Sequence, residues 1–239
     1  MNPRRRKMRI AVIAGAALAT LLVILLLTIE AAAAHGVAGS DRAFLEQSSG
    51  RQLIVYAYLG AKHMVTGYDH LLFLFGVVFF LYRMREVGIY VTLFAIGHSV
   101  TLLAGVLGEM HVNAHLVDAI IGLSVVYKAL DNLGAYQRWF GFQPSTKAAV
   151  LIFGFFHGFG LATKLQEFEL APEGLVANIL AFNVGVELGQ LLALGAILIV
   201  MAWWRRSPTF VRQAYASNTL LMAAGFVLIG YQLTGYFVS

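Results

Sequence analysis

The chain has 239 residues, of which 59% are hydrophobic and only 12% are charged. A soluble domain carries about 25% charged residues, so the composition excludes an ordinary soluble protein and favours a membrane protein. The sequence has no cysteine, which excludes disulfides, thiolate metal sites and cysteine nucleophiles. The net charge of +5 comes from short basic clusters between apolar runs. This pattern is typical of orientation signals in a membrane protein and does not indicate a nucleic-acid partner.

The N-terminus resembles a secretory signal, with a basic head, an apolar stretch and Ala32-x-Ala34 before a cut at His35. The apolar stretch is longer than the signal core of about 7–15 residues, so an uncleaved anchor stays open as an alternative for residues 1–34. We expect residues 35–239 to form a single membrane domain, in which residues 38–62 form an amphipathic surface helix.

Six further apolar segments follow, and their continuous rather than alternating apolar character favours helices over strands. A backbone in lipid must satisfy its hydrogen bonds internally, as helices do. The predicted fold is therefore all-α, a polytopic transmembrane helix bundle with six core spans plus an N-terminal signal peptide or signal anchor. The spans are placed near 67–83, 88–107, 113–132, 147–164, 175–204 and 215–237.

Basic and acidic residues alternate between successive loops. Cytoplasmic loops of membrane proteins are enriched in Lys and Arg, so the pattern predicts that the core N-terminus and the C-terminus are both external. The basic loops hold Arg83, Arg85, Arg138, Lys147, Arg205, Arg206 and Arg212, and the intervening loops hold Glu109, Glu167, Glu169 and Glu173.

Polar residues within the apolar segments are the candidates for function. A charged side chain at the bilayer centre costs at least about 2.5–3.5 kcal/mol, so such residues face the bundle interior and find partners. We expect imidazoles from four helices to meet a buried carboxylate in one pocket reached from outside. Neutral imidazole suits nickel, cobalt, zinc or copper, and a carboxylate offsets the charge of the ion. The predicted metal ligands are His63, Asp69 and His70 at the external end of the first core span, together with His98, His157 and Glu187. Supporting polar groups are Ser99, Asn183 and Gln190, with Asn183 and Gln190 on the helical face of Glu187.

Each of these residues also has a purely structural interpretation. His63 and His70 can form an interfacial pair capped by Asp69, and His98 can donate to a carbonyl of a neighbouring helix. Glu187 can form a salt bridge or be protonated. The remaining structural interpretations are ordinary loop residues for His111 and His115, close helix packing for Gly154 and Gly158, a local ion pair for Lys128 and Asp131, and a lipid-facing surface for the run LLFLFGVVFFLY.

Four motifs occur in the order HMVTGYDHLLFLFG, GHSVTLLAG, FFHGFGLA and FNVGVELGQ. They resemble the HupE/UreJ family, and most closely its second, broader branch, over residues 60–195. The resemblance implies a bacterial inner-membrane protein of the kind associated with hydrogenase and urease gene clusters and regarded as nickel permeases. This sequence has Met64 where the nickel-permease motif has proline, and His35 alone where a histidine-rich stretch often follows the signal. The family motifs fall on His63, Asp69, His70, His98, His157 and Glu187.

Two functions remain open, beside a purely structural or assembly role. The first is a permease that moves a divalent transition-metal cation, nickel by the resemblance, along a path of His, Asp and Glu from the external side. The second is an intramembrane hydrolase in which histidines hold a catalytic zinc and Glu187 acts as general base on a lipid or membrane peptide. A permease needs polar residues in both halves of the membrane, whereas an enzyme needs them in one. The expected partners are the lipid bilayer and the metal ion, and a homo-oligomer stays open.

Overall fold

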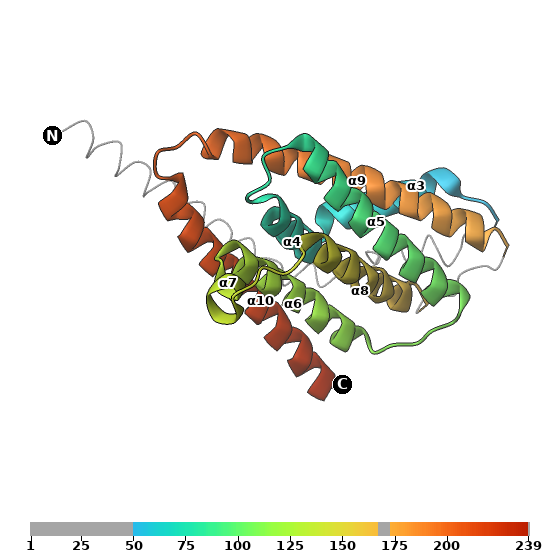
Figure 1. The fold of residues 1–239 in the computed structure, drawn as a ribbon. Coiled ribbons are helices and arrows are strands. Elements are labelled where there is room, and N and C mark those ends of the chain that lie inside the picture. Colours follow the sequence, from blue (N-terminus) through green and yellow to red (C-terminus); the bar gives the residue numbers. More distant parts are fainter. Residues whose placement is uncertain (1–49, 167–172, 239) are drawn as a thin grey trace.

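The computed structural model describes residues 50–166 and 173–238, and every regular element in these ranges is a helix. The predicted signal or anchor, His35, residues 38–49 of the expected surface helix, Glu167 and Glu169 lie outside the described residues. The helices are α3 (Leu53–Thr66), α4 (Tyr68–Val78), α5 (Met84–Leu107), α6 (Ala114–Asn132), α7 (Ala135–Phe140), α8 (Thr146–Gln166), α9 (Leu175–Trp204) and α10 (Phe210–Val238) (Figure 1).

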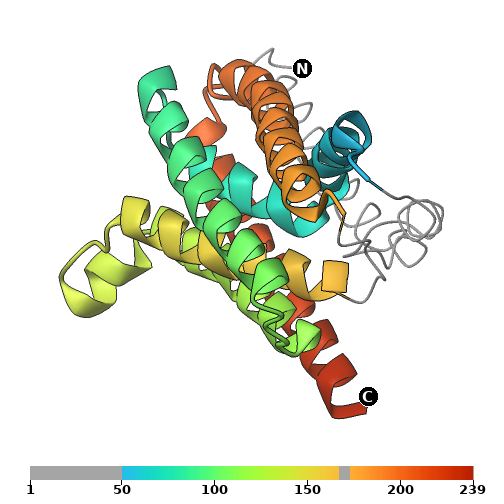
Figure 2. The ribbon, with the colours of Figure 1, turned by 90° about the vertical axis from the view of Figure 1, so that its right-hand side faces the viewer.

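Three pairs of helices build the bundle. Helices α3 and α9 run parallel along one side, α5 and α8 run parallel through the middle, and α6 and α10 run antiparallel on the other side (Figures 1 and 2). Asn178 ties the start of α9 to the start of α3, because its side chain accepts from the Gln52 N–H at 2.8 Å and donates to the Gly50 carbonyl at 2.9 Å.

Glycines let these pairs approach closely. A Cβ atom on Gly185 of α9 would lie 1.8 Å from the Ala57 carbonyl oxygen of α3. In the central pair, a Cβ on Gly158 of α8 would lie 2.2 Å from the His98 carbonyl oxygen of α5, and one on Gly154 would lie 2.6 Å from that of Phe94. The prediction that Gly154 and Gly158 serve helix packing is thus confirmed.

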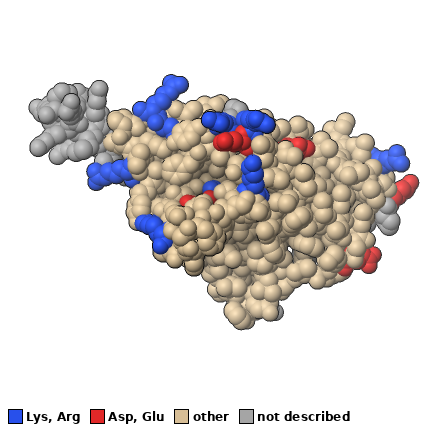
Figure 3. Space-filling view, in the orientation of Figure 1, with Lys and Arg blue, Asp and Glu red and all other residues tan. Residues whose placement is uncertain are grey.

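The two ends of the bundle differ in charge. One end, here called the basic end, joins α4 to α5, α6 to α8 and α9 to α10. The other, the acidic end, contains the starts of α3, α6 and α9 and carries Glu109 and Glu173. Most Lys and Arg side chains visible in Figure 3 lie toward the basic end. Its exposed basic residues are Arg83, Arg85, Arg138, Lys147, Arg206 and Arg212.

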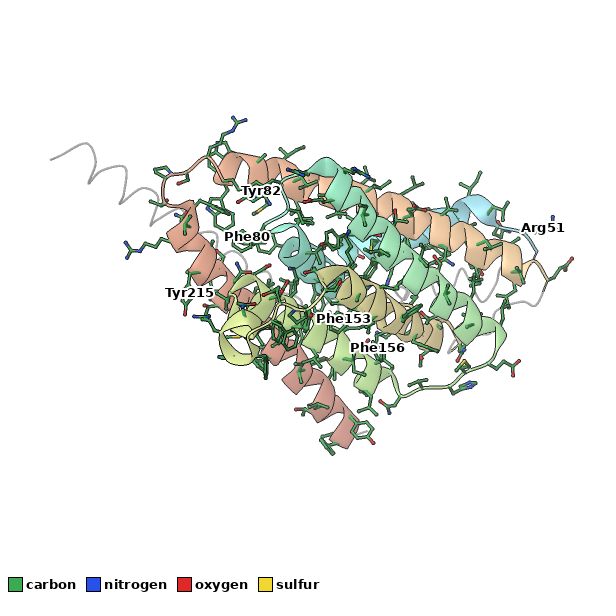
Figure 4. The ribbon with its side chains drawn as sticks, viewed as in Figure 1. Arg51, Phe80, Tyr82, Phe153, Phe156 and Tyr215 are labelled. Carbon is green, nitrogen blue, oxygen red and sulfur yellow. The ribbon has the colours of Figure 1, made fainter. Side chains whose placement is uncertain are left out.

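The first core span differs from the one predicted at 67–83. Helix α3 begins near Arg51 at the acidic end, and α4 continues to the basic end near Tyr82 (Figure 4), where the Arg205 guanidinium donates to the Phe79 carbonyl at 2.8 Å. The helical conformation is interrupted between α3 and α4 at Gly67, which has an extended backbone. Residues 53–62, expected in a surface helix, instead belong to α3, which packs against α9.

Four helices are long and apolar enough to cross a bilayer: Arg85–Leu107, Thr146–Gln166, Leu175–Trp204 and Phe210–Val238. They coincide with four of the six predicted spans. Helix α4 has only 11 residues, and α6 lies at the predicted position but carries Asp118, Lys128 and Asp131 within its 19 residues. Among the described residues, four helices are thus candidate membrane spans by length and composition, and the prediction of six spans is not confirmed.

Candidate metal site

Four histidines from four helices meet near the middle of the bundle. His70 of α4 is the central member, since its ring centroid lies 5.0 Å from that of His63 on α3, 4.8 Å from that of His157 on α8 and 6.4 Å from that of His98 on α5. His70, His98 and His157 are at most 3% exposed, and His63 is partly buried. These four residues are called the histidine cluster below.

The histidine cluster lies at mid-depth, which differs from the predicted position of His63, Asp69 and His70 at the external end of a span. The difference follows from the break at Gly67, because α3 first descends from the acidic end for about 20 Å. A Cβ on Gly67 would lie 2.8 Å from His70 Nδ1 and 3.2 Å from Asp69 Oδ1. The glycine therefore leaves room for the polar groups that follow it.

Hydrogen bonds set the tautomers of two members of the cluster. Asp69 Oδ1 lies 2.9 Å from His70 Nδ1, and the Phe153 carbonyl lies 2.7 Å from His157 Nδ1. Because both oxygens accept, each Nδ1 carries a proton, so Nε2 is the nitrogen that can offer a lone pair to a metal ion. Metal-binding histidines are oriented by this kind of partner. Within the described residues, His63 Nε2 and His70 Nε2 are enclosed without a hydrogen-bond partner.

Phenylalanine rings enclose the histidine cluster. Phe94 lies 5.0 Å from His157 and 6.0 Å from His98, centroid to centroid, and Phe73 lies 5.5 Å from His157. Phe73, a member of the run LLFLFGVVFFLY, is 1% exposed. The expectation that this run faces lipid was thus wrong for Phe73, which instead excludes water from the imidazoles. Toward the basic end the rings border a small apolar cavity lined by residues such as Val77, Val91 and Leu194.

Helix α9 places the amide of Asn183, and not the carboxylate of Glu187, beside the histidine cluster. Gln190 is fully buried, and the Asn183 side chain lies beside the His98 ring. Glu187 is exposed on the outward side of α9, so the structure does not bring it to the imidazoles, and the expected convergence on a buried Glu187 is corrected. The spacing of Asn183, Glu187 and Gln190 is compatible with one face of the helix. In the structure Gln190 is buried, whereas Glu187 is exposed. Ser99 is half-buried.

The acidic partner of the cluster is Asp69, which is 2% exposed. Within the described residues, no three His, Asp or Glu side chains are already arranged around one point as ligands of a metal ion. The imidazoles instead form a row of neighbouring rings centred on His70, from His63 on the side of α3 to His157 and His98 on the α5–α8 pair.

A second polar group lies between the histidine cluster and the acidic end. The Lys164 ammonium of α8 donates to Asp118 Oδ2 of α6 at 2.8 Å. Gln232 of α10 donates to the same oxygen at 3.2 Å and accepts from His115 Nδ1 at 2.8 Å. The sequence places both charges within predicted apolar segments, Asp118 in 113–132 and Lys164 in 147–164, but does not indicate that they pair. His115, expected in a loop, lies in α6. His111 is an exposed loop residue, and its Nδ1 forms a hydrogen bond with the Glu109 carbonyl of the same loop.

A third polar group lies toward the basic end. Lys128 and Asp131 form the predicted local ion pair, to which Thr146 adds a hydrogen bond at 3.2 Å. Nearby, Asn132 donates to Asn218 Oδ1 and to a carbonyl of α4, both at 2.8 Å. Buried polar groups therefore occur on both sides of the histidine cluster.

These features define a multi-pass helical membrane protein with a row of histidines inside the bundle. The family model described as HupE / UreJ protein matches residues 39–239, so the chain belongs to the HupE/UreJ family. This family is associated with nickel and cobalt transport in urease and hydrogenase maturation. No curated protein and no solved structure matches the chain.

Proposed function

We propose that the protein is a permease for a divalent transition-metal cation, with nickel as its substrate. The observation that carries this proposal is the meeting of four imidazoles, from four helices, at mid-depth beside the break in the α3–α4 crossing. Substrate sites of transporters lie near the bilayer midplane and are commonly formed where a membrane helix is interrupted. The association of the HupE/UreJ family with nickel and cobalt transport supports the same function.

The cation enters from the acidic end, which is external if the basic loops face the cytoplasm. It meets His63 first, because this is the most exposed of the four rings. His70 then binds the cation through its Nε2. Asp69, which is hydrogen-bonded to the Nδ1 of the same ring, offsets part of the charge of the cation. His157 and His98 follow on the central helix pair. Sharing the ion among neighbouring ligands keeps each site weak enough to release it.

Beyond the cluster, the Asn183 and Gln190 oxygens of α9 are weaker ligands that let the ion leave the imidazoles. The membrane potential favours inward movement by about 2.3 kcal/mol per charge per 100 mV, hence about twice that for a divalent cation. The sequence contains no GxxxxGK[ST] motif for ATP.

The alternative of a zinc-dependent intramembrane hydrolase acting on a lipid or membrane peptide makes a different demand on the bundle. An enzyme needs polar groups around one reaction centre, whereas a permease needs them along a path. The Asp118–Lys164 group lies on one side of the histidine cluster and the Lys128–Asp131 group on the other. This distribution favours the permease. In addition, exposed Glu187 is badly placed for the role of general base.

Uptake of radioactive nickel into vesicles that contain the purified protein tests the proposal. The His70→Ala and His157→Ala variants should lose nearly all uptake while inserting into membranes normally, because each removes a central imidazole. His111→Ala is the matched control, since this histidine is exposed and lies away from the cluster, and Glu187→Gln should also retain uptake. Normal uptake by both cluster variants contradicts the permease. Tightly held zinc with turnover of a lipid or peptide would establish the hydrolase instead.

A further inference from the structure

The Asp118–Lys164 ion pair stands between the histidine cluster and the acidic end. Asp118 lies one turn into α6, and Lys164 lies seven residues beyond His157 on α8, or about 10 Å further toward the acidic end. The side chain of Asp118 is 5% exposed and that of Lys164 is 13% exposed, and the pair joins α6 to α8 at 2.8 Å. Measured along the helices, the pair therefore lies between the histidine cluster and the acidic end.

One oxygen of the Asp118 carboxylate is unused. Oδ2 accepts from both Lys164 and Gln232, but Oδ1 is buried without a hydrogen-bond partner within the described residues. Oδ1 faces Gly160 of α8, where an added Cβ would lie 3.5 Å from it, in ordinary van der Waals contact, and 3.2 and 3.3 Å from side-chain carbons of Ile121 and Val117. Buried polar atoms normally have a partner, and a cation is the kind of partner that the negative charge of this carboxylate oxygen favours.

Stability alone does not explain the pair. Replacement of a buried ion pair by apolar side chains is often neutral or stabilising, because desolvation offsets the attraction between the charges. The Lys164 ammonium is also close enough to His63 to act on it electrostatically. While it is held there by Asp118, its positive charge opposes the approach of another cation to the first imidazole.

We propose that the Asp118–Lys164 pair is the gate of the permease on the acidic side, and that the substrate cation opens it by taking the Asp118 carboxylate from the Lys164 ammonium. This inference rests on the proposed function and extends it by naming the residues that control access. The divalent cation binds Oδ1 and Oδ2, and the displaced ammonium swings away on its flexible stem. The cation then moves from Asp118 to His63, after which Lys164 returns to the carboxylate and closes the path.

Thiol labelling tests closure of the gate without any assay of transport. The natural chain has no cysteine, so a Thr101→Cys variant carries a single thiol in α5, between the histidine cluster and the ion pair and adjacent to Gly158. A charged, membrane-impermeant reagent should label this thiol slowly. With Lys164→Gln added, labelling should become about tenfold faster, whereas Lys164→Arg should keep it slow. Equal rates in all three backgrounds would overturn the gate.

Nickel kinetics test the competition between the cation and Lys164. Lys164→Gln should lower the half-saturating nickel concentration about tenfold, and Asp118→Asn should raise it about tenfold. In the double variant the Lys164 change should have no further effect, because no carboxylate remains to be released. A pair that only stabilises the fold would instead change the amount of folded protein and leave half-saturation unaltered. Absence of uptake by the wild-type protein would refute the permease, while the labelling rates would still decide whether the pair closes the bundle.

Discussion

His70 connects the other members of the histidine cluster, since its ring is the one that lies near all three of them. Asp69 precedes it in sequence and holds its Nδ1. A carboxylate behind an imidazole fixes the orientation of the ring and raises its basicity as a ligand. Under the proposed function, the pair gives α4 an oriented nitrogen ligand directly after Gly67.

Asp69→Asn should weaken nickel transport without removing any imidazole. The amide carries no negative charge to offset the cation, and loss of such a partner typically reduces metal affinity about 10–100-fold. The initial rate of nickel uptake should therefore reach half-saturation at a correspondingly higher concentration. Glu173→Gln, which removes an exposed acid at the acidic end, is the control. An Asp69→Asn variant with unchanged half-saturation would show that the carboxylate does not assist His70.

At this scale, sequence identified the histidines but not their surroundings. Polar residues in apolar segments must face the interior, and this rule pointed to His63, His70, His98 and His157. The same rule applied to Glu187 failed because residues three or four positions apart share a face only approximately, and Gln190 occupies the interior position. Hydrogen bonds between helices, such as that from Lys164 to Asp118, depend on packing that no single segment encodes.

Helices α3 and α4 are short, follow one another from the acidic end toward the basic end, and are separated by Gly67. Neither has the length of a span, and residues 53–66 include Lys62 and His63. Hydropathy alone therefore assigned this stretch to the surface. Helix α3 is held in the bundle by close backbone contact with α9. This contact is possible because Gly185 and Gly189 of α9 have no side chain at the positions that face α3.

Gly185→Ala should separate α3 from α9. The added Cβ would lie 1.8 Å from the Ala57 carbonyl oxygen. Because this oxygen belongs to the backbone of α3, a side-chain rotation cannot relieve the clash. Overpacking of this kind costs about 1–3 kcal/mol, so Tm of the protein in detergent should fall and nickel uptake should decline with it. Gly195→Ala on the same helix is the control, because nothing lies within 4 Å of its Cβ. Equal Tm values for the two variants would contradict the packing of α3 on α9.

The whole molecule has two chemically distinct ends, and their orientation is a separate prediction. If the basic end is cytoplasmic, a cysteine at His111 should react in intact cells with a membrane-impermeant thiol reagent. A cysteine at Ser145, which is exposed at the basic end, should react only after permeabilisation. The wild-type chain provides the unlabelled background because it has no cysteine. The opposite labelling pattern would show that the basic end is external, and the proposed direction of transport would then be reversed.

Composition and continuous apolar runs were sufficient to predict an all-helical membrane protein, and the apolar runs located α5, α8, α9 and α10 closely. They did not reveal which helices pair. The pairing of α3 with α9 and of α5 with α8 depends on glycine faces such as those of Gly185 and Gly158, and the sequence shows these only as scattered small residues. The depth of the histidine cluster follows from that pairing, so it could not be predicted from the segments taken one at a time.

The nickel X-ray absorption spectrum of the purified, nickel-loaded protein tests the central claim most directly, because it reports the atoms bound to the ion. Binding within the histidine cluster predicts imidazole nitrogens around each bound nickel, with the scattering pattern of intact rings, and a loss of that signal in the His70→Ala variant. A spectrum that shows only oxygen ligands, or one that is identical in wild type and His70→Ala, would contradict a nickel path through these four histidines.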